Sequence, residues 1–192
     1  MNHILALNVG SSSYKCSLYD PKSLKLLQQY STKTLAEMFA LLPSTPPVAI
    51  GHRIVHGGTL YKKSTLINQA VVKNLKNLGE LAPLHNGPAI EAIETLYHHY
   101  GSKLVQVAVF DTAFFASMPH VARYYAIPKA LSDTYGIYRF GFHGISHSYL
   151  WEQYARHTGK HDAKIITLHL GAGCSASATA KGLPVDTSMG FT

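Results

Sequence analysis

The sequence predicts an α/β fold, and three observations support this class. Apolar, β-favouring runs alternate along the chain with segments whose apolar residues recur at helical spacing. Short glycine turns at 10–13 and 171–173 each join two such runs, which predicts a strand–turn–strand hairpin near each end of the chain. A further run at 104–110 delivers Asp111 at its carboxyl end, where open α/β sheets commonly place functional residues.

The predicted elements follow from these patterns in chain order. Strands are expected at residues 4–9, 14–19, 24–30, 48–55, 104–110, 165–170 and 175–180. Helices are expected at residues 35–42, 67–78, 87–100, 128–135 and 146–158. Thr34 and Glu37 form a capping-box pattern before the first helix, and Pro43 ends it. Asn86 is expected to cap the third helix, with Gly101 at its end.

The composition is that of a globular chain with a net positive charge. Of its 192 residues, 46% are hydrophobic and 14% charged, and the formal net charge is +7. The basic residues are scattered, which favours small anionic substrates and argues against nucleic acid. No apolar run is long enough to span a bilayer and no signal peptide is recognisable, so a cytoplasmic protein without a membrane partner is expected. Cys16 and Cys174 are expected to be core thiols rather than a disulfide.

The first glycine turn carries the donors that a phosphate group needs. It combines backbone N–H groups with hydroxyls that include Ser11 and Ser13, and Asn8 and Lys15 flank it. From these residues alone, an ordinary polar hairpin turn is an equally good interpretation. The second turn, at 171–173, shifts that balance, because two such turns facing each other across a cleft would hold a polyphosphate from both sides.

Two domains are expected to carry these two turns. The sequence pattern changes around residues 113–119, so the boundary is placed just past Asp111, which gives domains 1–111 and 112–192. Paired strand–glycine-turn–strand units resemble the actin-like ATPase and sugar-kinase architecture. That resemblance implies a ribonuclease H-like fold with a mixed sheet flanked by helices, in which residues 112–192 form only the first part of the second domain.

A series of motifs then occurs in one order: NVGSSSYK, GHRIVHGG, LAPLHNGPAI, VAVFDTAFF, YGIYRFGFHGISH, ITLHLGAG and VDTSMGFT. As an ordered set, they resemble acetate kinase and the related propionate and butyrate kinases over nearly the whole chain. The resemblance implies reversible transfer of the γ-phosphoryl group of ATP to a short-chain carboxylate. The products would be an acyl phosphate and ADP, with Mg²⁺ or Mn²⁺ as cofactor. It makes the first domain the carboxylate- and phosphate-binding one and the second the nucleotide side.

The resemblance also assigns roles to individual residues. The catalytic residues it implies are Arg53, Asp111 and His143. The substrate-binding residues are Arg53, Val55, Leu84, His85 and Phe142. The phosphate- and nucleotide-binding residues are Asn8, Ser11, Ser13, Lys15, His169, Gly171, Ala172 and Gly173. The metal ligands are Asn8 and Asp111. By pattern alone, Val55, Leu84 and Phe142 are plain core residues, and His147 is expected to cap or orient the loop at 141–144.

These residue types suit phosphoryl transfer, which asks a protein to align two oxygens and to neutralise charge on the equatorial ones. The forked guanidinium of Arg53 can donate two parallel hydrogen bonds to a carboxylate. His143 would contribute most if it donates while the transferring group flattens. Asp111 is expected to hold the metal, because a carboxylate substrate is already ionised and hardly needs a general base. Val55 suggests a pocket for a short acyl chain, which favours acetate over propionate or butyrate.

Several features depart from the pattern of the resembled family. Ala172 stands where Asn is usual, Phe115 stands where His is common, and the segment between Lys15 and Arg53 is shorter. Family members also continue beyond residue 192, through a second catalytic arginine, adenosine-binding loops and a carboxylate that anchors the metal. An arginine of that kind contributes about a thousandfold or more in rate. The isolated chain is therefore expected to be weakly active or inactive.

Two functions remain open at this stage. The first is an acetate kinase-type phosphotransferase, acting as a homodimer or with a complementing C-terminal half. The alternative is a truncated, non-catalytic relative that binds a carboxylate, an acyl phosphate or a partner kinase subunit.

Overall fold

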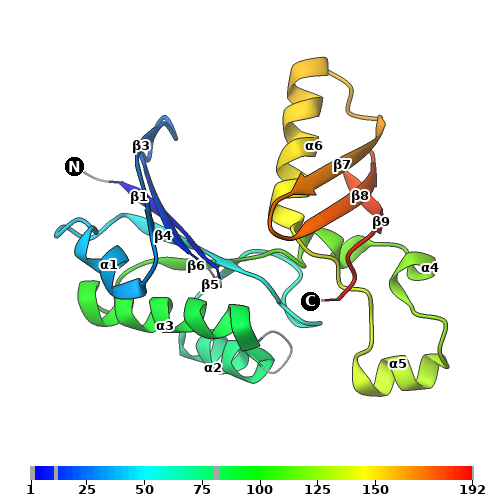
Figure 1. Cartoon of the computed structure of the whole chain (residues 1–192), viewed down its shortest axis with the longest axis horizontal. Coiled ribbons are helices and arrows are strands. Elements are labelled where there is room, and N and C mark those ends of the chain that lie inside the picture. The colour runs from blue at the N-terminus through cyan, green and yellow to red at the C-terminus, as the bar shows by residue number, and fades with distance from the viewer. Residues whose placement is uncertain (1–2, 11–12, 80–82, 192) are drawn as a thin grey trace. The chain divides into compact units, whose positions relative to one another are not determined.

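The computed structural model describes residues 3–10, 13–79 and 83–191, with side chains in the last range described from residue 86 on. The chain forms two compact units (Figure 1). Unit 1 comprises Met1–Ile54 and Ser64–Val109, and unit 2 comprises Val55–Lys63 and Phe110–Thr192. These ranges are not those of the predicted domains, because residues 55–63 belong to unit 2. The domain assignment itself stays a prediction.

A six-stranded sheet in the order β3-β2-β1-β4-β6-β5 forms the basis of unit 1. Its strands are β1 (Ile4–Val9), β2 (Tyr14–Tyr19), β3 (Leu26–Thr32), β4 (Ala49–Ile54), β5 (Thr65–Leu66) and β6 (Gln106–Phe110). Strand β1 pairs antiparallel with β2 and parallel with β4, so the sheet is mixed, as predicted. The predicted first hairpin is confirmed, because Val9 lies opposite Tyr14.

One face of this sheet is packed against helices, and the other is more open, with Ala6, Asn8 and Lys15 exposed on it. The unit's helices are α1 (Leu35–Ala40), α2 (Gln69–Leu78) and α3 (Pro83–Tyr100). Figure 1 shows α1 and α3 along the sheet, where Met38 and Leu96 join a core with Leu5 and Leu7. The alternation along β1 leaves Asn8 exposed on the opposite face.

Local signals explain where the helices start and stop. The hydroxyl of Thr34 accepts the N–H of Glu37 at 3.2 Å, which confirms the predicted capping pattern. At the end of α3, Gly101 adopts a φ of +92° and its N–H donates to Tyr97 O, also as predicted. The start of α3 was predicted wrongly, because Asn86 lies inside the helix and is fully buried. The helix begins instead at Pro83, whose fixed φ suits a first turn.

Unit 2 contains short helices, one long helix and a three-stranded antiparallel sheet. Its elements are η2 (Phe114–Ser117), α4 (His120–Arg123), α5 (Lys129–Tyr135), α6 (Gly144–Thr158), β7 (Lys164–Leu170), β8 (Cys174–Ala180) and β9 (Leu183–Thr187). The predicted second hairpin is confirmed by the β7–β8 pairing, with Leu170 opposite Cys174. Strand β9 was not predicted, because Pro184 and Asp186 are disfavoured in strands.

In the second sheet, too, one face is packed against a helix and the other is open. Helix α6 packs on β7, and it buries His147 and Ala155. On the outer face of β7, Ile166, Leu168 and Leu170 are exposed by 74%, 54% and 75%. In the part of the chain that the structure describes, no helix is both long and apolar enough to cross a membrane.

The two cysteines lie in different surroundings, and one of them was predicted wrongly. Cys16 is fully buried in the core of unit 1, and burial raises the pKa of its thiol to about 11. Cys174, expected to be a core thiol, is exposed. It opens β8 directly after the three-residue turn, with its side chain on the face of the sheet that α6 leaves open.

We therefore expect a thiol-specific reagent to label the native chain once, at Cys174. A thiolate is the reactive form, and burial keeps the Cys16 thiol both protonated and inaccessible. Intact mass after brief labelling should show one adduct in the wild type and in Cys16→Ala, and none in Cys174→Ser. Two adducts formed at equal rates in the folded wild type would contradict the assignment.

Candidate functional site

In unit 1, two predicted site residues from distant motifs meet on neighbouring strands. Arg53 Nη1 donates a hydrogen bond to Asn8 Oδ1 at 2.9 Å. The parallel register of β1 and β4 places Leu7 opposite His52, so Asn8 and Arg53 follow as neighbours at the carboxyl ends of the two strands. The carboxyl ends of parallel strands are where open α/β sheets bind ligands.

A second cation stands on the other side of Asn8. Lys15 on β2 lies directly opposite Asn8 on β1, and both side chains are exposed. The turn between these strands is closed by the N–H of Gly10, which donates to Ser13 O at 3.0 Å. Unit 1 therefore presents a row of Lys15, Asn8 and Arg53 on the face of the sheet opposite the helices. Ser11 lies outside the described residues.

In unit 2, three histidines gather where α6 begins and where β7 meets its glycine turn. This histidine cluster consists of His143, His147 and His169, and the rings of His143 and His169 stack with centroids 4.1 Å apart and 23° between planes. His143 is the N-cap of α6 and has a left-handed φ of +58°. The next residue, Gly144, donates its N–H to Asp111 O at 3.1 Å, which ties the start of α6 to the end of β6.

Hydroxyl groups connect the members of the histidine cluster. Ser175 Oγ lies 2.8 Å from His143 Nδ1 and 2.9 Å from His147 Nε2. Thr167 Oγ1 lies 2.7 Å from His147 Nδ1. In addition, Ser146 Oγ lies 3.0 Å from His169 Nδ1.

Sequence reasoning missed these hydroxyl residues, although the spacing of the histidines was a partial signal. The spacing of four between His143 and His147 puts both rings on one face of α6. Thr167 and Ser175 both point to the buried side of the β7–β8 hairpin, toward that face.

Burial dominates the electrostatics of this cluster. His147 is fully buried, and desolvation lowers the pKa of its imidazole to about 4, with the charges of His143 and His169 acting in the same direction and Asp111 opposing them. Phe115 contributes to this apolar shell, because its ring packs edge-on against His147 with centroids 6.0 Å apart. At neutral pH, His147 is therefore a neutral imidazole.

The glycine turn between β7 and β8 brings backbone close to two imidazole edges. A Cβ added to Gly173 would lie 3.3 Å from both His143 Cε1 and Nε2, and one added to Gly171 would lie 3.4 Å from His169 Nε2. Between them, Ala172 is exposed at the tip of the turn. The predicted second phosphate motif thus lies directly against the two stacked histidines.

The predicted metal ligands belong to different units. Asn8 is an exposed residue of unit 1, and Asp111 is a buried residue of unit 2, exposed by 1%. Within the described residues, no three His, Cys, Asp or Glu side chains form a group that could hold a metal ion. The assignment of these two ligands stays a prediction.

The predicted acyl pocket is described only in part. Val55 and Phe142 are both buried in unit 2, exposed by 6% and 2%. Phe142 packs against His56, with ring centroids 5.5 Å apart. The side chains of Leu84 and His85 lie outside the described residues, so the pocket stays a prediction.

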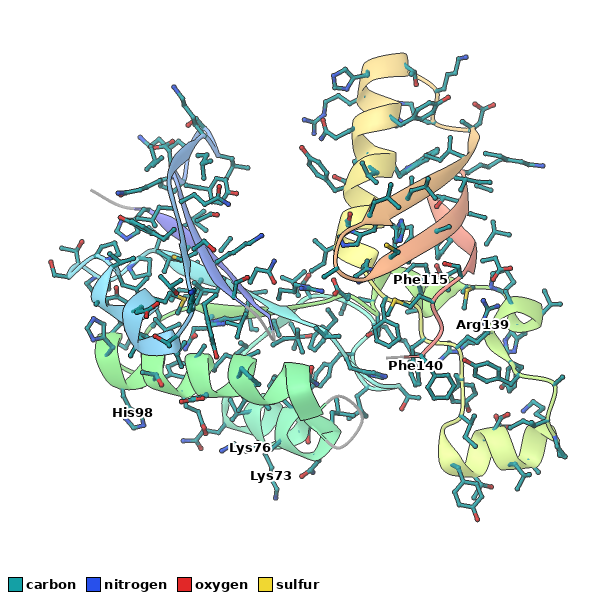
Figure 2. All side chains as sticks on the ribbon, in the orientation of Figure 1. Lys73, Lys76, His98, Phe115, Arg139 and Phe140 are labelled. Atoms are coloured by element: carbon teal, nitrogen blue, oxygen red, sulfur yellow. The ribbon has the colours of Figure 1, made fainter. Side chains whose placement is uncertain are left out.

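A cavity of about 690 Å³ lies in unit 1, away from these residues. It is lined by α2 and α3, and it includes Lys73, His98 and the ion pair between Lys76 and Glu94 at 2.6 Å. Figure 2 shows Lys73, Lys76 and His98 along the outside of these helices, whereas Phe115, Arg139 and Phe140 gather in unit 2. Of the predicted site residues whose side chains the structure describes, none lines the unit 1 cavity.

The sequence and the structure of this chain were both found to be similar to those of known kinases. The model of the acetokinase family matches residues 44–192. An acetate kinase from Sulfurovum sp. (strain NBC37-1) is 38% identical, over 98% of this chain and 57% of the relative. The structure of a propionate kinase from Francisella tularensis subsp. tularensis SCHU S4 superposes with a TM-score of 0.85 at 37% identity, over 99% of this chain and 58% of the other. Porphyromonas gingivalis acetate kinase also gives 0.85, at 29% identity and with coverages of 100% and 58%. The chain thus spans less than two thirds of the length of these relatives.

Proposed function

This chain belongs to the acetokinase family, and from that premise we propose that it provides the carboxylate- and phosphate-binding part of a kinase. The reaction would be reversible phosphoryl transfer between ATP and a short-chain carboxylate, with acetate the preferred substrate. The fold agrees with this membership, because the α/β, actin-like architecture predicted from the sequence is the one shared with the acetate and propionate kinases. The observation that carries the proposal is the hydrogen bond between Arg53 and Asn8, because it joins the residues assigned to carboxylate and to phosphate.

Arg53 is suited to the carboxylate because of its shape and its surroundings. A guanidinium donates two parallel hydrogen bonds to one carboxylate, and its charge persists at any physiological pH. The bond to Asn8 restrains the half-buried side chain before a substrate arrives, which lowers the entropy lost on binding. Lys15, on the next strand but one, adds positive charge beside the same row.

On the other unit, His143 and the turn at 171–173 would receive phosphoryl oxygens. Backbone N–H groups of a glycine turn can donate hydrogen bonds to an anion, and so can the N–H of a protonated imidazole. The stack with His169 and the nearby backbone at Gly173 limit the space around the ring of His143. A donor fixed in advance stabilises charge that develops later, at low reorganisation cost.

Mg²⁺ or Mn²⁺ is the cofactor that this reaction implies, and the residue types present fit it. Both ions prefer oxygen ligands, and Mg²⁺ commonly takes only one or two carboxylates together with phosphate oxygens and water. Asp111 would supply the carboxylate and Asn8 an amide oxygen. When bound, the ion would neutralise charge on the phosphate oxygens.

The proposal can be tested with the 192-residue chain, Arg53→Ala and Arg156→Ala. Arg156 is an exposed arginine in the last turn of α6 and serves as the matched control. We expect acetyl phosphate to raise the melting temperature of the wild type and of Arg156→Ala in a saturable way. Loss of a charged hydrogen-bonding partner should weaken binding to Arg53→Ala by roughly 10- to 100-fold.

A hydroxamate assay for acetyl phosphate on the same three proteins separates the two functions left open. Turnover that disappears in Arg53→Ala would support the kinase. Binding that depends on Arg53 without turnover would favour the non-catalytic relative. Neither binding nor turnover with acetate or acetyl phosphate would contradict the proposal.

A further inference from the structure

The hydroxyls of the histidine cluster form a continuous chain of hydrogen bonds from a strand carbonyl to His143. Starting from the buried end, Thr167 Oγ1 lies 3.4 Å from Ser177 O and 2.7 Å from His147 Nδ1. The other side of the His147 ring reaches Ser175 Oγ at 2.9 Å, and Ser175 reaches His143 Nδ1 at 2.8 Å. Every contact lies within unit 2, on α6, β7 and β8.

The direction of each bond follows from the number of protons once Thr167 is taken as the donor to the Ser177 carbonyl, 3.4 Å away. His147 is fully buried, and a charged imidazole there would be costly, so the ring carries one N–H. Thr167 has one hydroxyl proton, and the carbonyl of Ser177 is an acceptor only. If Thr167 donates to that carbonyl, its oxygen must accept the Nδ1–H of His147. The Nε2 of His147 is then an acceptor.

Counting protons in the same way gives the direction of the bond between Ser175 and His147. Ser175 is buried, exposed by 5%, and its single hydroxyl proton goes to the acceptor Nε2 of His147. Its oxygen can then only accept from His143, so His143 carries its proton on Nδ1. The Nε2 of His143 lies on the opposite edge of the ring, 3.3 Å from the place of a Gly173 Cβ, and so faces the glycine turn.

We propose that His147 is a positioning residue that acts through Ser175 to hold His143 in its Nδ1–H tautomer, with Nε2 directed at the glycine turn. Which nitrogen of a histidine carries the proton is set by the hydrogen bond that the other nitrogen makes. Nε2 is thereby the atom that accepts a second proton and, as imidazolium, can donate it to a phosphoryl oxygen. That last role rests on the proposed function, whereas the tautomer does not.

The tautomer can be measured directly on the free chain by nitrogen-15 NMR of histidine-labelled protein. A ring nitrogen that carries a proton is distinguished from one that does not by its chemical shift and by its couplings to the carbon-bound ring protons. At about pH 8, where ordinary histidines are neutral, we expect His143 to carry its proton on Nδ1 and none on Nε2. In Ser175→Ala, Nδ1 loses its partner, and His143 should become a mixture of both tautomers.

Two further variants separate this effect from a general loss of packing. Ser177→Ala removes a buried hydroxyl from the same strand that contacts Asp186 O and no ring nitrogen, and it should leave the tautomer unchanged. Ser175→Thr keeps the hydroxyl and should restore the Nδ1–H form. A wild-type His143 protonated on Nε2, or one whose tautomer is the same in Ser175→Ala, would overturn the inference. Because no substrate or turnover enters the measurement, a chain that neither binds nor turns over acetyl phosphate would count against the proposed function and not against this relay.

Discussion

Replacing Gly144 with alanine is expected to destabilise unit 2 by about 3 kcal/mol or more, one of the largest effects of any single methyl group in this chain. A Cβ at this position would lie 2.0 Å from Asp111 O, which is backbone and cannot move as a flexible side chain would. The same carbonyl accepts the Gly144 N–H, so relief of the clash also weakens the bond that anchors α6.

The chain contains a probe and a control for this measurement. Its single tryptophan, Trp151, lies on α6 and reports the unfolding of unit 2 in urea through its fluorescence. Gly87→Ala is the matched control, because Gly87 is also helical and nothing lies within 4 Å of its added Cβ. Because Gly87 lies in unit 1, that variant should leave the unit 2 transition reported by Trp151 unchanged. If the urea midpoint of Gly144→Ala equals that of the wild type, the backbone at the start of α6 can move enough to relieve the clash, and the prediction is wrong.

Acidification from pH 7 to pH 4 is the second change with a large expected effect, and it should destabilise both units. Burial lowers the pKa of His52 in unit 1, and of His56 and His147 in unit 2, from 6.5 to about 4. The unfolded chain therefore binds more protons than the folded chain between these values. The stabilisation that each neutral buried histidine contributes is fully present above about pH 6.5. It is lost as the pH falls through the folded pKa, by up to about 3 kcal/mol for each histidine.

The contribution of His52 can be isolated in unit 1. Its Nε2 lies 2.6 Å from Gln106 Oε1, so His52→Gln can keep a donor to that oxygen while removing the titrating group. We expect this variant to lose less stability between pH 6.5 and 4, measured by hydrogen exchange of the β1 and β4 amides. His98→Gln, at an exposed position of α3, should follow the wild type. Identical pH profiles for His52→Gln and the wild type would contradict the assignment.

Local chemistry made much of the fold predictable. The hairpins at 10–13 and 171–173 follow from glycine between β-favouring runs, and the start of α1 follows from a single side-chain cap. Family resemblance assigned site roles to Asn8 and Arg53, and the parallel register of β1 and β4 gives the hydrogen bond between them a physical cause.

Other features depend on tertiary contacts that a linear pattern does not contain. Asn86 has the chemistry of a cap, yet it is buried inside α3. Pro184 is tolerated in β9 because this strand lies at the edge of its sheet. The roles of Thr167 and Ser175 were hidden for another reason: a hydroxyl on a strand is ordinary, and only the ring of His147 between them gives both a partner.

The outer face of β7 is expected to make the purified chain prone to self-association. Within the described residues, β7 pairs only with β8, and its other border carries backbone groups beside the side chains of Ile166, Leu168 and Leu170. A strand of this kind is a template for another copy to add to. The tendency of the chain to aggregate should therefore depend more on Ile166, Leu168 and Leu170 than on the net charge of +7. Leu168→Lys should therefore reduce aggregation of the purified chain. The histidine cluster lies on the opposite face of the sheet and should be unaffected.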